Sequence, residues 1–149
     1  MIFLDANVFM YATGADGPYR DACITILEAC AQDLVKSVTN TEVLQEILYR
    51  YGRAGERPLA LRRAQQARAI VSGVLPVDDL DLRTAIDLMG QFGTLGVRDA
   101  IHAVTARRAE CSGVVSADRG FDPLAAAWIR RLDPLDFAQT LEVPEGAGG

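Results

Sequence analysis

The sequence has few of the residues that build metal–thiolate sites and disulfide frameworks. It contains three cysteines, Cys23, Cys30 and Cys111, without a Cys-x-x-Cys pair, and a single histidine, His102. A structural zinc site takes about four such ligands at short spacings, so the chain lacks the donors for one. Cys23 and Cys30 lie seven residues apart on a predicted helix, which indicates small side chains on one buried face.

Long apolar runs and nucleotide-binding motifs are also missing. No uncharged apolar stretch approaches the roughly 18 residues that span a bilayer, and Met1 to Asp5 lacks the basic stretch of a signal peptide. We therefore expect a cytoplasmic protein without a membrane partner. Neither GxGxxG after the first strand nor GxxxxGK[ST] occurs. A haloacid-dehalogenase-type phosphatase would need an aspartate two residues after Asp5, where Asn7 stands.

What the chain does have suits one globular domain. It has 149 residues, of which 50% are hydrophobic and 23% charged, enough to bury a core. We expect a single domain over residues 1–142 and a flexible tail over 143–149. Short apolar strands alternate with helices, which indicates an α/β fold with a parallel sheet covered on both faces. The expected strands are 2–4, 34–38, 75–77, 113–116 and 131–132, and the expected helices are 19–31, 39–51, 57–71, 78–89 and 97–109.

The positive charge is unevenly placed. The net charge is −5, and every basic residue except Lys36 is an arginine. Six arginines lie between positions 50 and 68 against one acid, Glu56. This pattern fits either a solvated helical face or a strip that holds a phosphate backbone.

Carboxylates are predicted at one edge of the sheet. Asp5 closes the first strand, Glu42 opens the helix after the second, and Asp118 and Asp122 follow the fourth, while Asp99 lies near a helix start. Each has a simpler explanation as a helix cap or dipole partner, including Glu42 as the capping-box partner of Thr39. Together, such acids repel one another unless a cation neutralises them. Oxygen ligands suit Mg²⁺ or Mn²⁺, which points to metal-dependent phosphodiester hydrolysis.

Four blocks in this order and spacing resemble the PIN-domain nucleases, over about residues 2 to 134. The blocks are Phe3-Leu4-Asp5-Ala6-Asn7-Val8, Ser37-Val38-Thr39-Asn40-Thr41-Glu42-Val43, Val97-Arg98-Asp99-Ala100-Ile101-His102-Ala103 and Val115-Ser116-Ala117-Asp118-Arg119-Gly120-Phe121-Asp122. The length and the closing Arg131-Leu132-Asp133-Pro134 are most similar to the VapC-type toxins of bacterial toxin–antitoxin pairs.

The resemblance implies a three-layer α/β/α sandwich with a short, mainly parallel sheet, and an Mg²⁺- or Mn²⁺-dependent endoribonuclease that leaves 3′-hydroxyl and 5′-phosphate ends. Asp5, Glu42, Asp99 and Asp118 would be catalytic. Asp5, Asp99 and Asp118 would bind metal, with Glu42 and Asp122 as further candidates, and Asn7 and Ser116 would support the acids. Arg50, Arg53, Arg62 and Arg63 would contact the RNA substrate or a small VapB-like antitoxin, since guanidinium pairs with phosphate and carboxylate alike.

Several alternatives stay open from the sequence. Glu46 lies one helical turn after Glu42 and offers a second candidate for the site glutamate, although Glu42 fits the strand-end pattern better. His102 fits packing or support of the acids better than a general base. Leu82, Ile86 and Met89 would permit a homodimer but equally fit a core. A housekeeping or DNA-directed PIN nuclease, or a catalytically silent PIN-like binding module, remains as an alternative function.

Overall fold

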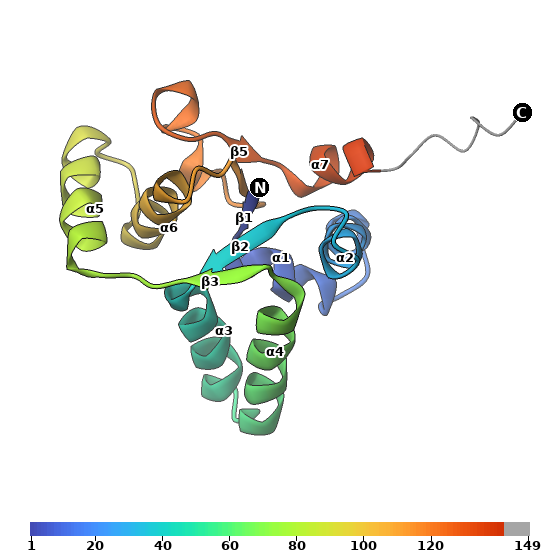
Figure 1. Ribbon diagram of the computed structural model, residues 1–149. Coiled ribbons are helices and arrows are strands. Elements are labelled where there is room, and N and C mark those ends of the chain that lie inside the picture. The colour runs from blue at the N-terminus through green and yellow to red at the C-terminus, as the bar shows by residue number, and fades with distance from the viewer. Residues whose placement is uncertain (142–149) are drawn as a thin grey trace, which may run out of the picture.

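The computed structural model describes residues 1–141, so the predicted tail and Glu142 lie outside the described residues. A sheet of five parallel strands runs through the molecule in the order β3-β2-β1-β4-β5 (Figure 1). The strands are β1 (Ile2–Leu4), β2 (Ser37–Asn40), β3 (Gly73–Leu75), β4 (Val114–Val115) and β5 (Arg131–Leu132). β1 is central because all three of its residues are buried and apolar, as expected for a strand covered on both faces.

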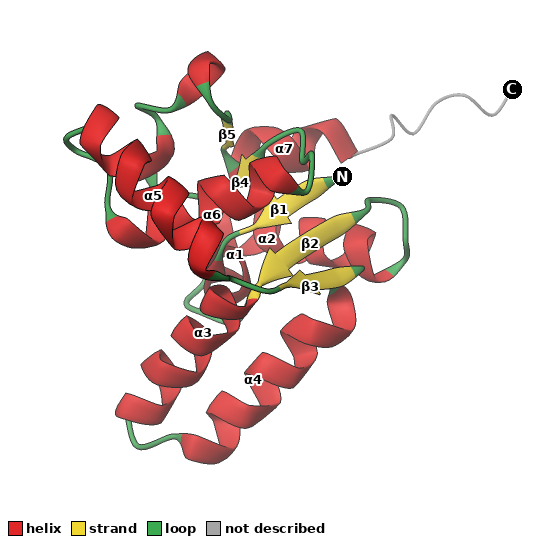
Figure 2. Ribbon diagram, turned by 60° about the vertical axis from the view of Figure 1, so that its left-hand side comes forward, coloured by secondary structure: helices red, strands yellow, loops and turns green. Residues whose placement is uncertain are grey.

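Helices cover both faces of this sheet. α5 (Asp79–Gln91) packs on α6 (Val97–Arg108) on one side, and α1 (Ala6–Ala12), α2 (Pro18–Ala31) and α7 (Pro134–Leu141) pack together on the other (Figures 1 and 2). α3 (Thr41–Arg53) and α4 (Arg57–Ile70) form a hairpin that extends away from the sheet. Two short 3₁₀ turns, Arg119–Phe121 and Ala125–Ala127, follow β4. The three-layer α/β/α fold predicted from the sequence is therefore confirmed.

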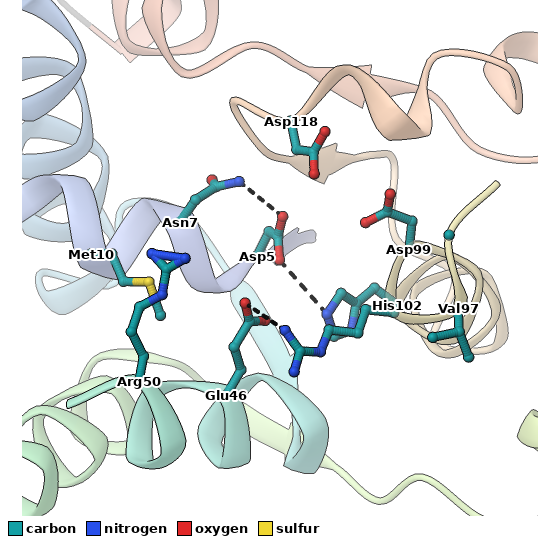
Figure 3. A pocket seen from close by; sticks show the side chains of 11 residues that line it. Asp5, Asn7, Met10, Glu46, Arg50, Val97, Asp99, His102 and Asp118 are labelled. Carbon is teal, nitrogen blue, oxygen red and sulfur yellow. Dashed lines mark hydrogen bonds and ion pairs between the residues drawn. The ribbon is translucent and has the colours of Figure 1, made fainter. Parts of the chain in front are cut away.

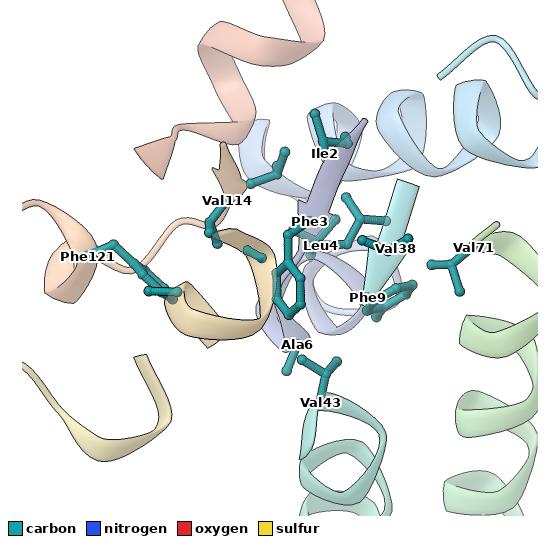
Figure 4. Packing of buried hydrophobic residues seen from close by; sticks show 14 of the residues in the cluster. Ile2, Phe3, Leu4, Ala6, Phe9, Val38, Val43, Val71, Val114 and Phe121 are labelled. Atoms are coloured by element: carbon teal, nitrogen blue, oxygen red, sulfur yellow. The ribbon is translucent and has the colours of Figure 1, made fainter. Parts of the chain in front are cut away.

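The core lies between these layers. Phe3, Val38 and Val114 from three neighbouring strands are buried together with Val43 of α3 (Figure 4). Over residues 1–141, no helix combines the length and apolar character that a membrane crossing requires. On α5, Leu82 and Ile86 are exposed, so they are not core residues, whereas Met89 packs partly against the core.

The boundaries of two strands differ from the expected ones, and in the second strand the reason is that polar residues are buried. The second strand was predicted at 34–38, yet Leu34 is 75% exposed and the strand runs on to the fully buried Thr39 and Asn40. Thr39 does not cap the next helix, because its hydroxyl donates to the Leu4 carbonyl at 2.9 Å. The Asn40 side chain accepts from the Val43 amide instead and caps α3. The third strand likewise lies at 73–75 rather than 75–77.

Two helices were not predicted. α1 follows β1 without a loop, and the Asp5 carboxylate accepts from the Ala6 amide at the helix start. Both α1, with seven residues, and α7, with eight, are too short to show a clear helical period. The direct turn from β1 into α1 matters for the site, because it holds Asp5 at the end of the strand.

Candidate active site

A cleft of about 580 Å³ opens at the carboxyl ends of β1 and β4 (Figure 3). In an open parallel sheet this edge, between strands whose connections diverge, is where ligands bind. Its lining brings together side chains from α1, α3, α6 and the loop after β4. The lining residues are Asp5, Asn7, Met10, Glu46, Arg50, Gly96, Val97, Arg98, Asp99, His102 and Asp118.

Asp5 is the buried centre of this cleft, with 6% of its surface exposed. Its Oδ1 accepts from the Ala6 amide at 2.7 Å, and its Oδ2 accepts from the Ser116 hydroxyl at 2.7 Å and the Asn7 amide at 3.0 Å. Asn7 also donates to Ser116 at 2.9 Å, and its oxygen accepts from the Ala117 amide at 3.2 Å. Asn7 and Ser116, which the resemblance suggested as supporting residues, thus hold Asp5 in a single orientation.

Asp118 and Asp99 stand on either side of Gly120. The Asp118 carboxylate accepts from the Gly120 amide at 2.8 Å, and its own amide donates to the Ser116 hydroxyl at 3.0 Å. A Cβ at position 120 would overlap the Asp99 carboxylate and lie 3.2 Å from Asp118 Oδ1. A side chain at position 120 would therefore displace the Asp99 carboxylate, whereas glycine leaves both acids close to this turn.

The glutamate that lines the cleft is Glu46, not Glu42 (Figure 3). Glu46 is half-buried and forms an ion pair with Arg98 at 3.3 Å. Glu42 lies one turn nearer the start of α3 and lines a neighbouring hollow beside Arg98. α3 begins at Thr41, so Glu42 lies in its first turn and Glu46 in its second, and it is the Glu46 carboxylate that comes within 4.8 Å of ligand atoms of Asp5 and His102.

His102 lies beneath the acids with 1% of its surface exposed. Its Nε2 is 3.7 Å from Asp5 Oδ1, and one ligand atom each of Asp5, Glu46 and His102 lie within 4.8 Å of one another. Burial lowers the pKa of His102 to about 4, against the opposing effect of Glu46 and Glu42. The imidazole is therefore neutral at pH 7.

The carboxyl groups of the cleft do not all ionise readily at the same time. Burial, together with the nearby charges of Asp118, Asp5 and Glu46, raises the pKa of Asp99 to about 7. Burial and, to a smaller extent, Asp118 also raise the pKa of Asp5, although the hydrogen bonds from Ser116 and Ala6 oppose this. A divalent cation would relieve this repulsion, and the carboxylate oxygens of Asp5, Glu46, Asp99 and Asp118 are a donor set that fits Mg²⁺ or Mn²⁺.

The remaining sequence candidates fall into two groups. Arg50 lines the acidic cleft and the two hollows beside it, and Arg53 lines one of these hollows with Tyr49. Arg62 and Arg63 lie on α4 outside the cleft lining, and Arg63 donates to Gln66 at 3.1 Å. Asp122 is also outside it, because its carboxylate pairs with Arg131 at 2.7 Å.

Three residues that contact residues lining the cleft were not identified from the sequence. The role of Arg98 as partner of Glu46 had no signal beyond its position beside Asp99. Asn40 at the end of β2 donates a hydrogen bond to Thr105 of α6 at 2.9 Å, beneath His102. Both are buried polar residues, which the hydrophobic pattern does not single out. Asn40 stands three residues before Val43, which is the spacing of a helix cap, but the sequence prediction gave the capping role to Thr39 with Glu42 as its partner.

Comparisons with known proteins match most of the chain. A family model described as PIN domain matches residues 2–127. Ribonuclease VapC13 of Mycobacterium tuberculosis is 34% identical over 132 residues, which cover 89% of this chain and 99% of that protein.

Solved structures share the fold. VapC20 of Mycobacterium tuberculosis, described as a Sarcin-Ricin loop cleaving toxin, has a TM-score of 0.68 at 17% identity, covering 87% of this chain and 97% of that one. A toxin–antitoxin complex from Klebsiella pneumoniae has a TM-score of 0.62 at 11% identity, covering 90% and 98%.

Proposed function

Because this chain belongs to the PIN domain family, and within it to the VapC group, we propose that it is a VapC-type toxin that hydrolyses RNA with the help of a bound divalent cation. The observation that carries the proposal is the convergence of Asp5, Glu46, Asp99 and Asp118 on one cleft where strand ends meet. The raised pKa of Asp99 supports it, since perturbed carboxyl groups in a cleft are typical of functional sites. RNA as the substrate is supported by VapC13, which is named a ribonuclease, and by VapC20, a Sarcin-Ricin loop cleaving toxin.

Asp5 and Asp99 are the principal proposed ligands of Mg²⁺ or Mn²⁺. Asp118 and Glu46 complete the acidic cleft from the two sides, and Glu46 takes the place first given to Glu42. A cation bound there would supply the positive charge that activates water and offsets charge on the scissile phosphate. The four carboxylates of the cleft supply oxygen donors, which are the ligands that these cations prefer.

The chain's other residues position these groups and the substrate. Asn7 and Ser116 keep Asp5 from rotating, so its oxygens need no reorganisation when substrate arrives. Arg50 and Arg53 place positive charge beside the cleft, where a phosphate backbone would otherwise meet only acids.

Cleavage of total RNA by the purified protein tests the proposal, with Mg²⁺, Mn²⁺ and EDTA compared. We expect discrete products with either metal and none with EDTA, and we expect Asp5→Asn and Asp99→Asn to abolish them. Asp87→Asn is the matched control, because Asp87 is exposed on α5 outside the cleft. Cleavage that survives EDTA, or that Asp5→Asn leaves intact, would contradict the assignment.

The same assay separates the alternative functions. Metal-dependent cleavage of single- or double-stranded DNA in preference to RNA would favour a DNA-directed PIN nuclease. Binding of RNA without cleavage under any metal would favour a catalytically silent module.

We also propose a small VapB-like antitoxin as the partner. The structure from Klebsiella pneumoniae supports this partner, because it shares the fold and is a toxin–antitoxin complex. The arginines beside the cleft could pair with carboxylates of such a segment as well as with phosphate. Coexpression with the candidate antitoxin should yield a complex on size exclusion that no longer cleaves RNA. Separate elution with undiminished cleavage would contradict it.

A further inference from the structure

The inference concerns the tautomer of His102 and begins with Asn40 at the end of β2. Asn40 is fully buried, and its Oδ1 accepts from the Val43 amide at 2.9 Å. A backbone amide can only donate, so this bond determines which end of the Asn40 side chain carries the oxygen. The Nδ2 end consequently faces α6, where it lies 2.9 Å from the Thr105 hydroxyl and 3.0 Å from His102 Nδ1.

The Asn40 amide then determines the protonation of the imidazole. Its two N–H groups have two neighbours, Thr105 and His102. The Thr105 hydroxyl donates back to carbonyls of its own helix, at 3.1 Å to Ile101 and to His102, so it can accept from Asn40. Because an amide nitrogen does not accept, His102 Nδ1 must be the acceptor, and the proton of the neutral ring must sit on Nε2.

The protonated nitrogen points at the acids. Nε2 is buried and has no hydrogen-bond partner among residues 1–141, and Asp5 Oδ1 lies 3.7 Å from it. An N–H in that position attracts a carboxylate but cannot ligate a cation, because its lone pair is occupied. The proximity of Asp5, Glu46 and His102 therefore does not make a three-ligand metal site.

We propose that Asn40 holds His102 in the Nε2-protonated tautomer, so that an N–H faces Asp5 and the imidazole stays out of the cation's ligand set. His102 is thus a positioning residue, and Asn40 controls it while also capping α3. The functional meaning of this arrangement rests on the proposed metal site. Its consequence is selectivity: an all-oxygen ligand set suits Mg²⁺ and Mn²⁺, whereas an added imidazole would favour Zn²⁺.

Nitrogen NMR tests the tautomer directly, because His102 is the only histidine of the chain. Long-range ¹H–¹⁵N spectra of the full chain at pH 7, without metal or RNA, should show a protonated Nε2 and an unprotonated Nδ1. Titration with Mg²⁺, and separately with Zn²⁺, should leave Nε2 protonated. A protonated Nδ1, or loss of the Nε2 proton on adding Mg²⁺, would overturn the proposal. The measurement does not involve RNA, so its outcome is independent of whether the protein cleaves RNA.

Asn40→Asp is the informative variant. Aspartate caps helices about as well as asparagine, but it replaces the donor facing Nδ1 with an acceptor. We expect Nδ1 to become protonated and the affinity for Zn²⁺ relative to Mg²⁺, measured by calorimetry, to rise about tenfold. Thr105→Val is the control, because it removes the neighbouring hydroxyl but leaves the Asn40–His102 bond, so the wild-type pattern should persist. An unchanged pattern in Asn40→Asp would also overturn the proposal, and the wild-type spectrum decides it if that variant does not fold.

Discussion

At the scale of single residues, the cleft contains a carboxylate with a fixed orientation, Asp5, and a carboxyl group whose pKa is raised, Asp99. Asp5 receives three hydrogen bonds and cannot turn away from the cleft. Asp99 lies where ionisation is costly, and its pKa of about 7 reflects burial and three neighbouring acids. Such a site resists ionisation until a cation binds, which is the behaviour expected of a metal centre built from carboxylates.

The two glutamates of α3 provide a direct test at this scale. We expect Glu46→Gln to lower metal-dependent RNA cleavage about 10–100-fold, because its carboxylate lines the cleft beside Asp5 and His102. Glu42→Gln is the matched control on the same helix and should cleave at close to the wild-type rate. Initial rates at saturating Mg²⁺ measure both. If Glu42→Gln were the more damaging change, Glu42 would be restored as the site glutamate.

At the scale of elements, the α3–α4 hairpin divides its arginines between two surfaces. Arg50 lines the cleft and Arg53, one turn later on α3, lines the hollow beside it, while Arg62 and Arg63 on α4 line neither. Because residues three and four apart share a helix face, Glu46, Arg50 and Arg53 form one strip beside the cleft. The strip can therefore hold a phosphate near the acids, and the α4 pair is available for other contacts.

Paired substitutions separate the two surfaces. Arg50→Gln combined with Arg53→Gln, in an Asp5→Asn background that prevents cleavage, should weaken RNA binding about tenfold. It should also reduce the salt slope by about 0.7 for each phosphate that the arginines no longer neutralise. Arg62→Gln with Arg63→Gln has the same charge change and should bind RNA nearly as the parent does. Fluorescence anisotropy at two or more salt concentrations measures both, and equal losses would contradict the proposed strip.

At the scale of the whole molecule, repulsion between the carboxylates of the cleft lowers the stability of the fold. Four carboxylates from four parts of the chain are brought to one cleft beside a largely apolar core. Proteins commonly trade stability for function in this way, and removal of a site charge then stabilises the fold. The exposed Leu82 and Ile86 on α5 leave a homodimer as a prediction at this scale.

Thermal unfolding of Asp99→Asn tests this cost. The folded-state pKa of Asp99, about 7, lies above its ordinary value of 3.8, so the folded state binds the proton more tightly. The penalty is absent below about pH 3.8, grows as pH rises and is complete above pH 7. Without divalent ions, Asp99→Asn should therefore raise Tm by on the order of 3 °C at pH 8, and the difference should vanish toward pH 4.

Added Mg²⁺ should make the Tm of the wild type higher than that of Asp99→Asn. Binding to the folded state raises the Tm of the wild type, whereas Asp99→Asn, which lacks a proposed ligand, should respond weakly. Asp87→Asn, with the same change at an exposed position, is the control at each pH. A Tm for Asp99→Asn at or below the wild type at pH 8, or an equal Mg²⁺ response in both, would contradict the argument.

Much of the architecture could be predicted because it depends on local pattern. β1, β5 and the start of α6 occur where they were expected, and for β1 the reason is plain, since a short, fully buried apolar run is a signal within a few residues. β2 was misplaced by about three residues because hydrophobic pattern favoured Leu34 over Thr39 and Asn40. Those polar residues are buried only because Leu4, His102 and Thr105 satisfy them from distant parts of the chain.

The sequence by itself determined the alternation of strands and helices, the composition of the acidic blocks and their order, because these depend on residue type and spacing. Only the tertiary structure decided which acids share the cleft. Glu46 replaces Glu42 there, and Asp122 turns to Arg131 instead. The reason is physical: a one-turn shift along α3 or a competing guanidinium moves a carboxylate by several ångströms without changing the local pattern. The tautomer of His102 is a further example, since it depends on an amide 62 positions away.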